Sequence, residues 1–225
     1  MKAVVCRRIV DIGLVLSIIA AMDRQVTGES MHEWTGILMA GFLLVHQILN
    51  RGWYRGLFRG RYGPYRIGLT GLDLLLIFSS AGVILSGISM GVHAIPLLHG
   101  VIGLTLARKL HLPMAHWMFL LAGLHAGFHI RTERMKIRGP VRSFLLAACV
   151  AAAGCGLSLF LQQGIPDYLF LRAHFAFYDE EKGAARIIAE KLLIFFFWVM
   201  AGHAASRLLR NADKTGARRT PHKKS

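Results

Sequence analysis

Four histidines occur in two pairs that have the same separation, each pair within a long apolar stretch. His32 and His46 are fourteen residues apart, and so are His111 and His125. In an α-helix, fourteen residues bring a side chain back to within about 40° of its starting direction and advance it by about 21 Å. Each stretch therefore predicts a helix that presents an imidazole near both ends of one face.

Neutral imidazole is a common metal ligand, and two imidazoles can ligate a haem iron from opposite sides. If the two helices run in the same direction, His32 pairs with His111 at one level and His46 with His125 at the other. The spacing then predicts two stacked haems, each held by one histidine from each helix. A haem ligated on both sides suits electron transfer rather than oxygen chemistry. The chain has no CxxCH motif, so we expect non-covalently bound haem b.

A fifth histidine leaves the inner ligand open. His129 follows His125 by one helical turn on nearly the same face, so it could replace His125 or bond a haem propionate. His116 lies about 140° around the helix from His111, which points it away from the expected haems. Histidines within membranes also act as packing residues or proton relays. A proton-linked transporter and a structural membrane subunit without haem are therefore alternative functions.

The stretches that carry these histidines indicate a membrane protein. The chain has 225 residues, is 54% hydrophobic and has a mean hydropathy of +0.47, which is too apolar for a typical soluble domain. We expect an all-α transmembrane bundle of about six spans. They fall at residues 9–22, 31–49, 67–91, 112–130, 143–161 and 191–209. Residues 1–135 would form a four-span haem-binding core, residues 136–210 a two-span part with an outer segment, and residues 211–225 a basic tail.

Positive charge is distributed unevenly along the chain. Twenty of the 27 Lys and Arg residues lie before the first expected span, after the second, after the fourth, or from Arg207 at the end of the sixth onward. Loops rich in these residues remain in the cytoplasm, so we expect both termini inside. The net charge of +15 is thus interpreted as an orientation signal, with attraction to anionic membrane lipid as a secondary effect. No nucleic-acid-binding motif accompanies the charge, so no nucleic acid partner is expected.

Three local patterns give further expectations. Ser30 and Glu33 fit a capping box at the start of the second span. Asp11, at the cytoplasmic end of the first span, is expected to reach lipid headgroups or the neighbouring Arg7 and Arg8. Small residues beside the paired histidines leave room either for a flat macrocycle or for close helix packing; they are Gly36, Gly41, Gly123 and Gly127.

Several runs of the sequence resemble one family. TGESMHEWTGILMAGFLLVHQILNRGWY, RYGPYR and ARKLHLPMAHWMFLLAGLHAGFH resemble the flavinylation-associated cytochromes, and PDYLFLRAHFAFYDEE followed by a span containing GH is similar to their C-terminal part. The resemblance covers roughly residues 9–209. It implies a bacterial inner-membrane cytochrome that works with flavin-bearing proteins outside the cytoplasmic membrane. The family's histidines fall on His32, His46, His111, His125 and His129.

The expected function is transmembrane electron transfer. Electrons would come from a quinol or a cytoplasmic reductase and pass to an extracytoplasmic flavin-bearing partner. The chain has no flavin-attachment motif of the DGxTGAT type and no nucleotide-binding glycine loop. We therefore expect an electron-transfer subunit of an oxidoreductase system rather than a stand-alone enzyme.

Overall fold

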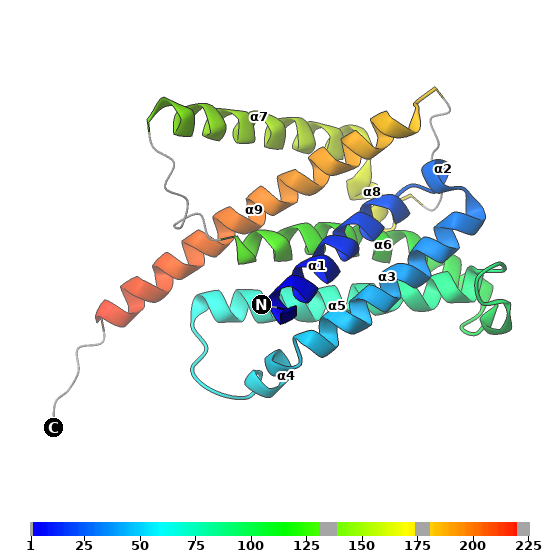
Figure 1. The fold of residues 1–225 in the computed structure, drawn as a ribbon, viewed down its shortest axis with the longest axis horizontal. Coiled ribbons are helices and arrows are strands. Elements are labelled where there is room, and N and C mark those ends of the chain that lie inside the picture. Colours follow the sequence, from blue (N-terminus) through cyan, green and yellow to red (C-terminus); the bar gives the residue numbers. More distant parts are fainter. Residues whose placement is uncertain (1, 131–138, 174–180, 220–225) are drawn as a thin grey trace.

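Helices make up the fold of the chain, which the computed structural model describes at residues 2–130, 139–173 and 181–219. Within these ranges there are nine α-helices, one short 3-10 helix and no strand (Figure 1). The long helices are α1 (Lys2–Ala21), α3 (Glu29–Leu49), α5 (Pro64–Met90), α6 (Leu104–His129), α7 (Pro140–Gln162) and α9 (Ala184–Arg219). The short ones are α2 (Arg24–Thr27), α4 (Gly52–Gly56), η1 (Pro96–Leu98) and α8 (Ile165–Leu169). The expected all-α class is confirmed.

The long helices pack in pairs around α6. Helix α1 packs on α3, α5 packs on α6, and α9 packs on both α6 and α7 (Figure 1). Helices α3 and α6, which carry the paired histidines, are not closely packed against each other. The α1–α3 pair therefore faces the α5–α6 pair across the interior of the bundle.

Two contacts between distant residues each join a pair of helix ends on the same side of the bundle (Figure 1). The Arg7 guanidinium donates to the Leu49 carbonyl oxygen at 2.9 Å, which joins the start of α1 to the end of α3. The backbone N–H of Tyr65 donates to Asp213 Oδ2 at 3.4 Å, which joins the start of α5 to the last turns of α9. We call this the inner end of the bundle. The opposite end, with α2, η1 and α8, is the outer end (Figure 1).

Glycines let α9 lie directly on α6. A Cβ on Gly127 would overlap the backbone of Val199 and Gly202 in α9, and a Cβ on Gly202 would overlap the backbone of Leu124 in α6. Gly123 also faces α9, at Trp198 and the Phe195 carbonyl. Of the two alternatives for Gly123 and Gly127, the structure therefore supports close helix packing.

Two of the described helices, α5 and α7, are long and apolar enough to cross a membrane. Helix α7 leaves large apolar side chains outside the bundle: Phe144 is 73% exposed and Val150 is 69% exposed. Such side chains are typical of a helix that faces lipid. These helices support a membrane protein.

Several helix ends differ from the sequence-based expectations. Helix α6 begins at Leu104 rather than residue 112, directly after Gly103, whose positive φ of 78° turns the chain out of the preceding loop. Helix α9 continues to Arg219, so residues 211–219 of the expected tail are helical, while residues 220–225 lie outside the described residues. The expected capping box is wrong. Helix α3 begins at Glu29 after Gly28, without a side-chain cap.

Candidate functional site

The outer pair of histidines faces across the bundle. The ring centres of His32 in α3 and His111 in α6 lie 6.1 Å apart, with an interplanar angle of 71°. His111 Nδ1 lies 3.0 Å from Ser86 Oγ in α5. Because the Ser86 hydroxyl donates its hydrogen to the Gly82 carbonyl, its oxygen is the acceptor and His111 Nδ1 is the donor. His32 Nδ1 is buried and has no hydrogen-bond partner among the described residues.

The inner pair repeats this arrangement closer to the other end. The ring centres of His46 and His125 lie 6.5 Å apart, with an interplanar angle of 75°. His46 Nδ1 is 2.8 Å from Asp11 Oδ1 in α1, and His125 Nδ1 is 2.8 Å from Asp73 Oδ1 in α5. The interpretation of Asp11 as a partner of lipid headgroups, Arg7 or Arg8 is therefore replaced by a hydrogen bond to His46.

An oxygen that accepts a hydrogen bond from Nδ1 determines which ring nitrogen of the neutral imidazole carries the proton. A neutral ring that donates from Nδ1 keeps a lone pair on Nε2, which is the form that binds a metal ion. Metal-ligating histidines almost always donate their other N–H to a carboxylate, carbonyl or similar oxygen. His46, His111 and His125 have such an oxygen in place, and His32 does not.

The spacing within each pair fits one iron between two imidazoles. A metal–nitrogen bond of roughly 2 Å on each side, plus about 1 Å from nitrogen to ring centre, places the two centres about 6 Å apart. The centres are 6.1 and 6.5 Å apart at the outer and inner levels. Among the described residues, no group of three or more His, Cys, Asp or Glu side chains could hold a bare metal ion. A haem iron needs only one protein ligand on each side.

Space is available beside these rings. A cavity of about 670 Å³ opens at the outer end, and His32, His111, Gly36 and Gly87 are among the residues that line it. A Cβ on Gly36 would meet no atom within 4 Å, and the same is true of Gly41 in the next turns of α3. A Cβ on Gly87 would lie 3.2 Å from the His111 ring. Unlike Gly123 and Gly127, these glycines border open space or a paired histidine.

His129 lies beside His125 rather than across from His46. The ring centres of His125 and His129 are 4.6 Å apart, as expected for residues one turn apart on α6. The pair that spans the interior at this level is His46 with His125. His129 therefore stands next to the inner pair, where it can contact the same bound group.

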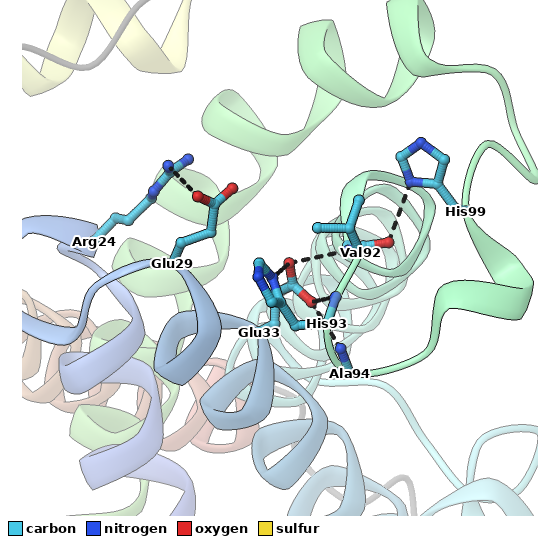
Figure 2. Close-up of polar contacts among 8 residues, drawn as sticks. Arg24, Glu29, Glu33, Val92, His93, Ala94 and His99 are labelled. Carbon is cyan, nitrogen blue, oxygen red and sulfur yellow. Dashed lines mark hydrogen bonds and ion pairs between the residues drawn. The ribbon is translucent and has the colours of Figure 1, made fainter.

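A carboxylate ties the outer loop to the helix that carries His32 (Figure 2). Glu33 accepts hydrogen bonds from the backbone N–H groups of Val92, His93 and Ala94 at 3.0, 2.7 and 2.9 Å. Its Oε1 also lies 3.1 Å from His93 Nδ1. Glu33 therefore joins α3 to the loop after α5, next to the outer pair, instead of closing a capping box.

The remaining described histidines lie outside the two pairs. His116 Nδ1 donates to the Leu112 carbonyl at 2.8 Å, and its ring stacks on Tyr168 with centres 4.7 Å apart. His93 and His99 lie on the exposed outer loop. His203 is buried in α9.

Sequence reasoning identified the four facing histidines but not their hydrogen-bond partners. Asp73 and Ser86 lie in the apolar stretch that forms α5, and an ionisable residue in such a stretch is itself a signal of function. Pairing Asp73 with His125 required knowing how α5 and α6 align.

Comparison of the chain with models of known families, with curated proteins and with solved structures finds no match. The fold and the paired histidines are therefore the grounds for a functional assignment.

Proposed function

We propose that the chain is a multi-pass membrane cytochrome that holds two b-type haems and transfers electrons across the bacterial inner membrane. The observation that carries this proposal is the presence of two pairs of facing imidazoles at two levels of one bundle, with ring centres 6.1 and 6.5 Å apart. His32 and His111 would hold the outer haem, and His46 and His125 the inner one. His129 would contact the inner haem or replace His125. The chain would belong to the flavinylation-associated cytochromes.

The hydrogen bonds at Nδ1 are the contribution of the chain's own residues to haem binding. Asp11, Asp73 and Ser86 orient three of the imidazoles and keep Nε2 as the ligating atom. A haem held this way supplies reversible one-electron chemistry at its iron.

The charge pattern sets the proposed orientation. Helices α1, α3, α5, α6, α7 and α9 would be the six spans, with the arginine-rich inner end in the cytoplasm and both termini inside. Electrons would then pass from a quinol or cytoplasmic reductase to a flavin-bearing protein outside. In this role the chain is an electron-transfer subunit in contact with membrane lipid.

The inner Asp–His pairs favour a second candidate, a proton relay. Asp11 with His46 and Asp73 with His125 place two carboxylates and two imidazoles at one level, and such groups carry protons in membrane proteins. A relay requires no haem, so haem content separates the two functions.

The test is a dithionite-minus-oxidised absorption spectrum of the purified protein in detergent, with haem quantified per chain. We expect a sharp b-type α-band and two haems, with His32→Ala and His46→Ala each removing one. His99→Ala is the matched control because His99 is exposed on the outer loop. A colourless protein after expression with adequate haem supply would contradict the proposal and favour the relay.

A further inference from the structure

The outer cavity continues around α6 beyond the pair formed by His32 and His111. His116, Gln163, Tyr168 and Lys191 also line it, and we call these four residues the annex. His116 follows His111 by five residues, which is about 140° around the helix axis. His116 therefore lies on a different face of α6 from His111, and a group held by His32 and His111 would leave this part of the cavity to another occupant.

An aromatic pair forms one wall of the annex. The rings of His116 and Tyr168 are nearly parallel, with centres 4.7 Å apart and an interplanar angle of 18°. His116 Nδ1 lies 2.8 Å from the Leu112 carbonyl oxygen, which can only accept, so Nδ1 is the donor. The neutral imidazole therefore keeps Nε2 as a hydrogen-bond acceptor.

A buried ammonium group also lines the annex. Lys191 is 9% exposed, and its Nζ donates to Gln163 Oε1 at 2.8 Å. Asp23 Oδ2 lies 4.0 Å from Lys191 Nζ. An ammonium group has three N–H donors, so Lys191 retains donor capacity on the cavity wall.

Apolar side chains complete the surroundings of these polar groups. Ile18, Met22, Ile165 and Ile187 line the same cavity. The cavity is also lined by charged side chains that pair with one another, Arg24 with Glu29 and Lys182 with Glu190. A ligand that matches the annex has an apolar body, one group that donates to an imidazole and another that accepts from an ammonium.

We propose that the annex binds the ring of a membrane quinol, with one ring hydroxyl donating to His116 and the other ring oxygen accepting from Lys191. A quinol dissolved in the bilayer can reach a cavity inside a membrane-embedded bundle. The inference rests on the proposed function and selects a quinol, rather than a cytoplasmic reductase, as its electron donor.

The reaction balances with groups that line the cavity and the haems of the proposed function. Oxidation of the hydroquinone breaks two O–H bonds and releases two electrons and two protons. The two haems of the proposed function, when bound, would accept one electron each, the outer one first. One proton would go to His116 Nε2 and the other to the carboxylate of Asp23, which also lines the cavity and lies 4.0 Å from Lys191 Nζ.

Binding can be measured separately from electron transfer. The probe is menadiol, titrated anaerobically by calorimetry into dithionite-reduced protein in phospholipid nanodiscs. We expect about one molecule bound per chain. His116→Phe, which keeps a ring against Tyr168, and Lys191→Met should each weaken binding by about tenfold or more, because each removes one hydrogen bond to a buried ligand.

Matched controls use the same substitutions outside the cavity. His99 and Lys109 are exposed at the outer end and do not line it, so His99→Phe and Lys109→Met should retain the wild-type affinity. Haem per chain is measured in every variant. If the haem-loaded wild type does not bind menadiol, or if both annex variants bind it as the wild type does, this inference is wrong while the proposed function stands.

A second measurement needs no substitution. Photolysis of an azido-naphthoquinone with the wild-type protein should label peptides that contain His116, Tyr168 or Lys191, in competition with menadiol. Labelling confined to the lipid-facing helix α7 would overturn the annex as the binding site. A wild-type preparation without haem would instead contradict the proposed function.

Discussion

Asp73 Oδ1 on α5 lies 2.8 Å from His125 Nδ1 on α6. Across the bundle, Asp11 Oδ1 on α1 lies at the same distance from His46 Nδ1 on α3. Each helix that bears an inner histidine is thus paired with a neighbour that supplies a carboxylate. A carboxylate that accepts from Nδ1 makes the imidazole a more electron-rich ligand through Nε2.

The outer level lacks carboxylates at the corresponding atoms. His111 Nδ1 meets the neutral hydroxyl of Ser86, and His32 Nδ1 has no partner. Ligands with weaker hydrogen bonds donate less electron density to iron and favour its reduced state. We expect the outer haem to have the higher reduction potential, so that electrons at equilibrium reside first at the outer level.

The first prediction concerns Asp73. Replacing it by Asn keeps an acceptor oxygen but removes the charge, so the reduction potential of the inner haem should rise by on the order of 60 mV, a tenfold change for one electron. The outer potential should change little. A spectroelectrochemical titration resolves the two midpoints, with Ser86→Ala as the control that acts on the outer midpoint. An unchanged inner midpoint would show that Asp73 does not bond a ligand.

The second prediction distinguishes His125 from His129 as the ligand of the inner haem. His125 is the residue whose ring faces His46 at 6.5 Å, whereas His129 stands beside it at 4.6 Å. His125→Ala should therefore reduce the content from two haems to one. His129→Ala should retain two and change at most the inner midpoint. Haem quantified per chain decides between them, and loss of one haem in His129→Ala alone would assign that residue as the ligand.

The third prediction tests the hydrogen bonds of Glu33, which join α3 to the outer loop (Figure 2). Glu33→Gln removes the charge that accepts three backbone N–H groups, and we expect a cost of about 2 kcal/mol. Amide exchange at residues 92–94 should accelerate, and the outer haem should be lost more readily in detergent. Glu29→Gln is the matched control, because Glu29 forms an exposed ion pair with Arg24 at 3.2 Å that contributes little. Equal exchange rates in the two variants would show that the hydrogen bonds of Glu33 do not protect residues 92–94.

The sequence predicted the six long helices because their apolar runs are long and separated by arginine-rich or glycine-rich links. It also predicted which histidines share a level, because a fixed spacing on a helix determines both direction and height. Periodicity does not say which neighbouring helix lies against a given face. The sequence therefore predicts lipid headgroups, Arg7 or Arg8 as partners of Asp11, although the packing of α1 on α3 brings it to His46.

Glu33 illustrates a second limit of local patterns. Ser30 and Glu33 have the spacing of a capping box, but the backbone N–H groups of residues 92–94 offer Glu33 three donors at once. A tertiary contact of this kind outweighs a single local bond, and it depends on a loop nearly sixty residues away in the chain.

The fourth prediction uses glycines that have opposite surroundings. Gly36 borders open space beside the outer pair, and an added Cβ would meet no atom within 4 Å. Gly36→Leu should therefore leave the fold intact while filling the space next to His32, so that the protein holds one haem per chain instead of two. Gly127 lies against the backbone of α9. Gly127→Ala must separate α6 from α9 and should cost about 2 kcal/mol or more, as overpacking does.

Thermal unfolding and haem content, measured together in detergent, separate these two effects. Gly36→Leu should lower haem content with little change in the melting temperature of the haem-free protein. Gly127→Ala should lower that melting temperature whether or not haem is bound, because the overlap lies between α6 and α9 rather than in the cavity. If Gly36→Leu retained two haems, the open space beside His32 would not be the place where the outer haem lies.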